Sequence, residues 1–90
     1  GGRIYDVIPN KDHLYLWGSH PGKGSGMLVL NISDAAKPIE VAFHRGIDVP
    51  SAYINKNWIW RNGRLIGFQP SGKTVRALYI TDPKEFKTIC

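Results

Sequence analysis

Residues 26–41 read GMLVLNISDAAKPIEV and predict a strand, a turn and a second strand in succession. The first strand is apolar on both faces, with Leu28, Leu30 and Ile32 on one and Met27 and Val29 on the other. Ser33 and Asp34 then supply short side-chain oxygens that hydrogen-bond nearby backbone amides and end the strand. Because a strand that is apolar on both sides is covered on both sides in the folded protein, this segment predicts a stacked sheet.

Short apolar runs of this kind recur along the chain, rich in β-branched and aromatic residues and bounded by turn formers. Helical periodicity is almost absent. We expect strands at 4–8, 13–17, 27–32, 39–44, 58–60, 64–68 and 74–81, with a last one at 86–89. Asn62-Gly63 indicates a two-residue hairpin, since both residues tolerate the positive φ of a type I′ turn. The glycine-rich segment 18–26 is expected to be a nine-residue loop.

The two halves of the chain repeat one unit. The pattern apolar, any residue, Ile, hydroxyl, Asp ends at Asp34 and again, 48 positions later, at Asp82. Upstream, residues 13–17 match residues 64–68, and the loops that follow both contain proline and Gly-Lys. Similar elements in the same order at a spacing of about 50 residues are typical of solenoids, propellers and arrays.

Residues 26–41 resemble the LVIVD-type β-propeller repeat, whose pattern is a glycine, an alternating apolar strand, a Ser-Asp-Pro-like turn, a second proline and a final strand. The resemblance extends over 4–45 and, less closely, over 58–89. It implies an all-β chain whose antiparallel meanders form two blade-like repeats, 1–46 and 47–90, in one structural unit. Propellers need about four to eight blades, so the chain is expected to belong to a larger or oligomeric propeller.

That resemblance also bears on function. The family carries no shared catalytic residues, so it implies a binding or scaffold segment rather than an enzyme, and it favours an extracellular or periplasmic location. Two alternatives stay open: a lectin-like oligomeric propeller that binds carbohydrate, and a non-catalytic portion of a propeller enzyme. Fold alone does not choose among these functions.

The expected partners are other copies of the chain or the rest of a longer parent polypeptide. We expect Leu30, Ile32, Leu78 and Ile80 to be buried in equivalent positions, and Met27, Val29, Tyr79 and Trp58 to lie on outer faces that such a partner covers. Burying each large apolar side chain is worth about 1.5–3 kcal/mol, which a small domain cannot easily forgo. Cys90, the single cysteine, is available for a covalent tie to a neighbour.

Composition favours a polar or anionic ligand. The 90 residues carry a net charge of +5, which steers anions toward the protein. The lysines and arginines are spread about one per turn, so a nucleic-acid interface is not expected. No apolar run is long enough for a membrane-spanning helix. His13, His20 and His44 match no ligand spacing, and we name no metal site, no cofactor and no catalytic residue.

The candidate ligand-binding residues fall in two groups. Trp58 and Trp60 share one strand face next to Arg61 and Arg64, and aromatic platforms beside hydrogen-bond donors suit sugars; packing between sheets is the alternative role of these tryptophans. The other group lies in the Gly-Lys loops and comprises His20, Lys23 and Lys73, because glycine-rich loops can present amides to an anion.

Residues 67–74 match the phosphate-loop pattern G-x-x-x-x-G-K-T letter for letter. Nucleotide binding by that loop needs a helix directly after it, whose N-terminus meets the phosphates. Here an apolar strand is expected to follow, and Asp82-Pro83 would end any helix early. We therefore interpret the match as a hairpin loop.

Overall fold

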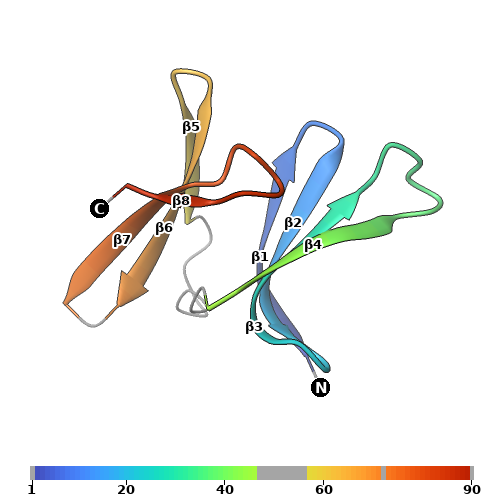
Figure 1. Cartoon of the computed structure of the whole chain (residues 1–90), viewed down its shortest axis with the longest axis horizontal. Coiled ribbons are helices and arrows are strands. Elements are labelled where there is room, and N and C mark those ends of the chain that lie inside the picture. The colour runs from blue at the N-terminus through green and yellow to red at the C-terminus, as the bar shows by residue number, and fades with distance from the viewer. Residues whose placement is uncertain (1, 47–56, 72, 90) are drawn as a thin grey trace.

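The computed structural model describes residues 2–46, 57–71 and 73–89, and these residues form two four-stranded sheets (Figure 1). The first sheet, sheet A, contains β1 (Arg3–Asn10), β2 (His13–His20), β3 (Gly24–Asn31) and β4 (Ile39–Arg45). The second, sheet B, contains β5 (Trp58–Arg61), β6 (Arg64–Ser71), β7 (Thr74–Tyr79) and β8 (Lys87–Thr88).

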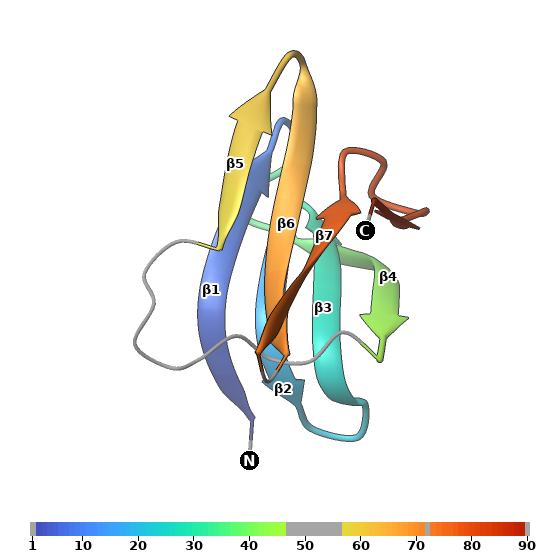
Figure 2. The ribbon, with the colours of Figure 1, turned by 90° about the vertical axis from the view of Figure 1, so that its left-hand side faces the viewer.

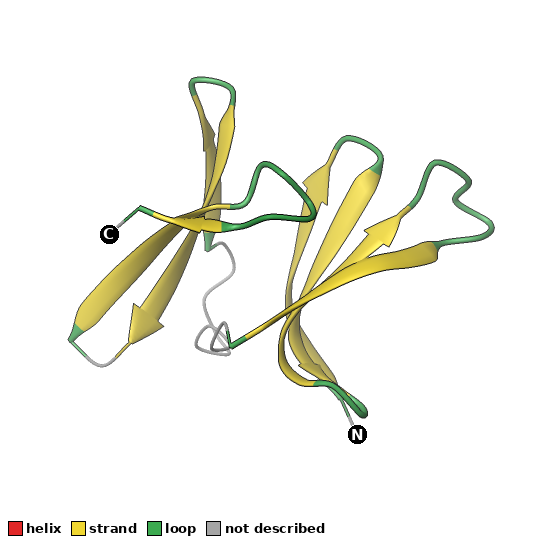
Figure 3. Ribbon diagram, viewed as in Figure 1, coloured by secondary structure: helices red, strands yellow, loops and turns green. Residues whose placement is uncertain are grey.

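Each sheet is an antiparallel meander in which spatial order follows chain order. Strands and turns account for the described residues, with no helix among them (Figure 3). The prediction of an all-β antiparallel chain is confirmed, and each expected strand coincides with an observed one to within a few residues at its ends. The predicted boundary between the repeats adjoins residues 47–56, which lie outside the described residues, as do Gly72 and Cys90.

The first hairpin of each sheet has a two-residue turn whose first residue has positive φ. Asn62 and Gly63 have φ values of 52° and 74°, as the dipeptide predicts, and Lys11 occupies the corresponding turn of sheet A at 55°. The equivalent strands β2 and β6 begin directly after these turns, at His13 and Arg64. Asp12, the second turn residue in sheet A, does not share the positive φ of Gly63, so the two turns differ in backbone conformation.

The prediction of a nine-residue loop at 18–26 is wrong. β2 continues to His20 and β3 begins at Gly24, so only a tight turn separates them. Gly18 and Gly26 lie inside the strands, where a Cβ would come within 2.0 Å of the Arg3 carbonyl oxygen and 2.3 Å of the His44 carbonyl oxygen. These glycines permit close approach of neighbouring strands rather than loop freedom.

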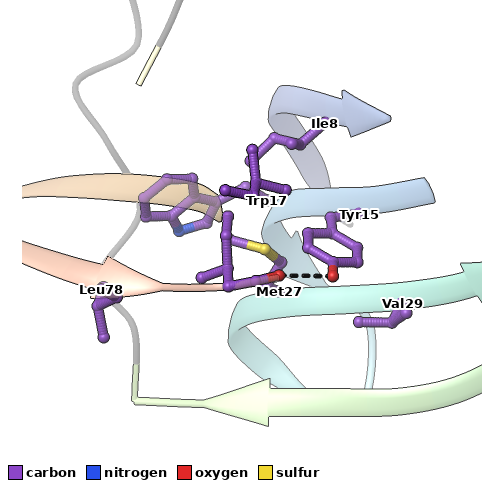
Figure 4. Close-up of a cluster of buried hydrophobic side chains, with 8 residues drawn as sticks. Ile8, Tyr15, Trp17, Met27, Val29 and Leu78 are labelled. Carbon is purple, nitrogen blue, oxygen red and sulfur yellow. Dashed lines mark hydrogen bonds between the residues drawn. The ribbon is translucent and has the colours of Figure 1, made fainter. Parts of the chain in front are cut away.

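The core lies between the sheets, which are stacked face to face (Figure 2). Sheet A contributes Ile8, Tyr15, Trp17, Met27 and Val29, and sheet B contributes Leu65, Leu78 and Ile80, all buried (Figure 4). Apolar surface removed from water is worth about 25 cal/mol per Å², so this contact stabilises the packing of the two sheets.

The structure corrects the expected burial of β3. Met27 and Val29, predicted on an outer face, are core residues, whereas Leu30 and Ile32 are only half-buried. Leu78 and Ile80 are buried as predicted. Tyr79 is half-buried on the outer face, as predicted, whereas Trp58, also predicted on an outer face, packs against the core. The predicted alternation of side chains within each strand is confirmed. A period of two residues does not indicate which face of the strand packs against the other sheet.

Hydrogen bonds tie the sheets together at the core's edge. The Tyr15 hydroxyl donates to the Ile80 carbonyl oxygen at 2.6 Å and accepts from Asn10 Nδ2 at 2.7 Å. Asn10 Nδ2 also donates to the Thr81 carbonyl oxygen. Burial raises the pKa of Tyr15 to about 12, because the phenolate would lose its hydration; the hydrogen bond from Asn10 opposes this effect and the charge of Asp82 adds to it.

Corresponding edges of the two sheets also meet. Near β1 and β5, Asp6 Oδ2 accepts from the Asn57 backbone amide at 3.2 Å. On the side of β4 and β8, the His44 ring stacks on Phe86 with centroids 3.6 Å apart, and His44 Nε2 lies 2.7 Å from the Pro83 carbonyl oxygen. The sheets are thus stacked in the same strand order.

Strand register shows that the sheets pack through non-equivalent faces. The β2–β3 pairs Leu14–Leu30 and Leu16–Leu28 correspond to Leu65–Ile80 and Gly67–Leu78 of sheet B, whereas Tyr15–Val29 and Trp17–Met27 correspond to Ile66–Tyr79 and Phe68–Ala77. In sheet A the second set faces the core, and in sheet B the first set does. The stacking is therefore head to tail, as in a repeat array, rather than symmetric.

Candidate functional site

Two adjoining hollows lie on the outer face of sheet B and share Arg64 and Tyr79. One, of about 410 Å³, is also lined by Thr81, Asp82, Glu85 and Lys87. The other, of about 350 Å³, is also lined by Arg61, Asn62 and Ile66. We call them together the Arg64–Tyr79 recess, and they are the strongest candidate site among the described residues.

The turn between β5 and β6 positions the two arginines. Arg61 and Arg64 are direct cross-strand partners on either side of Asn62-Gly63. The Arg64 guanidinium carbon lies 4.8 Å from the centre of the Tyr79 ring, a cation–π distance. Like charges opposite each other destabilise a sheet, so this pair favours an anion between or beside them.

The opposite wall of the recess is a capped turn. Asp82 Oδ1 accepts from the Lys84 backbone amide at 3.0 Å, and the Glu85 amide donates to the Asp82 carbonyl oxygen. These bonds hold the turn after β7 and place two carboxylates at the rim. The two arginines favour a carboxylate or another hydrogen-bond acceptor on their side of the recess, and the two carboxylates favour a donor at the rim.

The structure separates the predicted sugar platform. Trp58 and Trp60 pair with Gly67 and Leu65, residues of the face turned toward sheet A, and Trp58 packs against the core. Arg61 and Arg64 lie on the opposite face because they occupy the alternate positions of the strands. The two tryptophans therefore do not share a surface with the two arginines.

His20 and Lys23 do come together, on the outer face of sheet A. His20 Nε2 lies 3.0 Å from the Leu16 carbonyl oxygen, and the ring meets Phe43 edge-on. Lys23 Nζ lies 3.0 Å from a Glu40 carboxylate oxygen and 5.7 Å from the Phe43 ring centre. Both polar side chains thus have intramolecular partners beside the β2–β3 turn.

Lys73 is exposed in the turn between β6 and β7. Because Thr74 begins an antiparallel strand, the interpretation of residues 67–74 as a hairpin is confirmed, and the helix that a phosphate loop needs does not follow. In the described parts of the chain, no group of three or more His, Cys, Asp or Glu side chains is placed to hold a metal ion. No helix there is long and apolar enough to cross a membrane.

Sequence reasoning missed Tyr79, Asp82, Glu85 and Lys87 as members of the recess. A usable signal was present: the Asn62-Gly63 turn fixes the β5–β6 register, and alternation then places Arg64 and Ile66 on one face. The β6–β7 register, which brings Tyr79 beside Ile66, depends on a turn whose geometry the sequence does not specify.

Comparisons with known proteins leave the family open. No family model matches the chain, and no curated protein and no solved structure matches it. The likeness to LVIVD-type repeats therefore stays a prediction from the residues.

Proposed function

We propose that this chain is a two-blade segment of a β-propeller and serves as a binding scaffold with no catalysis of its own. The observation that carries the proposal is the head-to-tail stacking of two four-stranded meanders in the same strand order. A propeller blade is a four-stranded antiparallel sheet repeated around an axis, and each blade packs between two others.

The outer faces support the same conclusion. Sheet A presents Val7 and Phe43 with half-buried leucines of β2 and β3, and sheet B presents Ile59, Phe68 and Tyr79. Apolar rows that cross whole sheets mark interaction surfaces in soluble proteins. Both ends of the stack therefore have the character of blade faces that lack a neighbour.

The carbohydrate-binding alternative has less support. Its platform needs Trp58 and Trp60 with Arg61 and Arg64 on one surface, and these residues lie on opposite faces of sheet B. Trp58 contributes to the packing between sheets, the alternative role that the sequence suggested for it. A binding role then rests on the turns and on the Arg64–Tyr79 recess.

A crystal structure of the chain in its assembled form tests the proposal. We expect both outer faces to be covered by further four-stranded sheets, stacked in the same strand order around one axis. Outer faces that are covered by another kind of element, or that are left in solvent in a well-ordered monomer, would contradict it.

A further inference from the structure

The stack ends in two different surfaces. The A face is the outer face of sheet A and comprises Val7, Leu14, Leu16, Leu28, Leu30 and Phe43. The B face is the outer face of sheet B and comprises Ile59, Ile66, Phe68, Ala77 and Tyr79. Val7 is 46% exposed, Ile59 38% and Phe68 36%, so large apolar side chains reach solvent at both ends.

Each end is the counterpart of a surface already buried inside the chain. By register, Ile66, Phe68, Ala77 and Tyr79 occupy the positions of Tyr15, Trp17, Met27 and Val29. Likewise Leu14, Leu16, Leu28 and Leu30 occupy the positions of Leu65, Gly67, Leu78 and Ile80. The chain thus carries both halves of the contact that holds its own sheets together, one unused half at each end.

The hollows of the molecule show the same relation. Between the sheets, a pocket of about 230 Å³ has Asn10, Lys11 and His13 on one wall and Thr81 and Pro83 on the other. Arg61, Asn62 and Arg64 are the counterparts of that first wall, and they line the open hollow on sheet B. The open hollow of Arg61, Asn62 and Arg64 therefore has the counterpart of the first wall but not of the second. The part of sheet A that corresponds to the second wall, Thr81 and Pro83, is the turn after β3.

That turn is built like the turn after β7. Asp34 Oδ1 accepts from the Ala36 amide at 3.0 Å, and the Asp34 carbonyl oxygen accepts from Lys37, as Asp82 does with Lys84 and Glu85. Asp82 lies close enough to raise the pKa of Tyr15, across the packed interface. Its counterpart Asp34 is exposed and anionic, and the hollow that lacks a wall contains Arg61 and Arg64.

We propose that the A face of a second copy of this chain docks on the B face of the first, with the Asp34 turn of that copy in the hollow of Arg61, Asn62 and Arg64. The inference rests on the proposed function and adds the identity of the neighbour and the mating surfaces. A second copy is the occupant because one sequence supplies apolar complementarity at both faces and an aspartate opposite paired arginines. The contact is heterologous, so it generates a ring or an open stack.

Two blocking variants test the geometry. Val7→Arg places a charge on the A face, and Phe68→Arg places one on the B face; Ile39→Arg is the control, since Ile39 is 62% exposed and lies on the other side of sheet A from the A face. Circular dichroism first establishes that each variant keeps its fold. Sedimentation velocity then gives the mass of each variant alone and of an equimolar mixture.

Head-to-tail docking needs one intact A face and one intact B face. We therefore expect each blocked variant to be a monomer, the mixture to form a dimer of twice the 10.1 kDa chain mass, and the control to assemble like the unaltered chain. A blocked variant that assembles alone, or a mixture that stays monomeric, would overturn the inference. If the unaltered chain is a loosely folded monomer, the docking of a second copy is overturned but the proposed function stands. If it is a well-folded monomer that unfolds cooperatively, both the docking and the proposed function are overturned.

The aspartate is tested separately in the mixture. Asp34→Asn, introduced into the Phe68→Arg chain, keeps the oxygen that accepts from Ala36 and removes only the charge. We expect the dimer to dissociate about tenfold more readily, the scale of one charge-assisted hydrogen bond. Asp12→Asn, at an exposed turn of the same sheet, is the matched control and should leave the affinity unchanged. Equal effects of the two variants would show that Asp34 does not meet the arginines.

Discussion

Trp17 and Phe68 occupy equivalent register positions in the two sheets, yet Trp17 is completely buried and Phe68 is 36% exposed. Both are aromatic, and both lie on the second strand of their sheet, where Trp17 pairs with Met27 and Phe68 pairs with Ala77. The difference comes from their place in the stack, since sheet B covers Trp17 and no described residue of the chain covers the B face. The burial of a side chain in these sheets thus depends on the neighbouring sheet as much as on the residue itself.

The largest expected effect breaks this comparison at its buried member. Trp17→Ala removes a fully buried side chain and should lower the free energy of unfolding by about 3–5 kcal/mol. Phe68→Ala should cost less, about 1–2 kcal/mol, because about a third of Phe68 is already exposed to water. Urea denaturation measures both in the Val7→Arg background, where self-association does not contribute. Equal losses at the two positions would mean that Phe68 is as buried as Trp17.

A smaller effect is expected at the polar tie between the sheets. Tyr15→Phe leaves the Ile80 carbonyl oxygen without its side-chain donor and removes an acceptor from Asn10, so unfolding should become easier by about 1–3 kcal/mol. Tyr5→Phe, at a half-buried position near one end of β1, is the control and should change stability by under about 0.5 kcal/mol. If both variants behave alike in chemical denaturation, the Tyr15 hydroxyl does not join the sheets.

Alkaline pH gives a further test of the same group. The pKa of Tyr15 is about 12 in the folded chain, compared with 10.0 for a tyrosine that is not buried. A raised pKa stabilises the folded state below pH 10, and this contribution is lost as the pH rises from 10 toward 12. Subtracting the stability curve of Tyr15→Phe from that of the unaltered chain isolates the effect from the titration of lysines. A difference that stays constant over this range would contradict the buried position of the phenol.

The smallest effect is expected at Lys73. The hairpin offers no helix N-terminus to a phosphate, so we expect no nucleotide binding by the unaltered chain. Lys73→Ala should therefore give the same result as the unaltered chain. Calorimetric titration with ATP and magnesium is the measurement. Micromolar affinity in the unaltered chain that the variant loses would restore the phosphate-loop interpretation.

Much of the fold could be predicted from the sequence. Alternating apolar residues located the strands, Asn62-Gly63 located a hairpin turn, and the strand after Lys73 excluded a phosphate loop. These features are local, so a few neighbouring residues suffice to specify them.

The face that packs inward could not be predicted in this way. β3 is apolar on both sides, and Met27 and Leu28 have similar hydrophobicity, so only the second sheet decides which of them is core. The match of Asp34 with Asp82 also correctly pairs two capped turns, but it aligns Ile32 with Ile80, whereas register aligns Leu30 with Ile80. Sheet A has two more residues than sheet B between the third strand and the turn that follows it, and a shift of two residues keeps the same face while it changes the cross-strand neighbour.

The candidate site shows the same limit. Trp58, Trp60, Arg61 and Arg64 are close in sequence and were grouped for that reason, but strand alternation sends the tryptophans and arginines to opposite faces. Tyr79 joins Arg64 through the β6–β7 register, which is a long-range property of the sheet.

The central proposal is that the two head-to-tail sheets are propeller blades, and that other blades cover their complementary outer faces. Sedimentation equilibrium of the unaltered chain, from low to high micromolar concentration, tests it most directly. We expect an assembly of a whole number of chains, about two to four if the ring has four to eight blades. A single species of 10.1 kDa that unfolds cooperatively at every concentration would contradict the account.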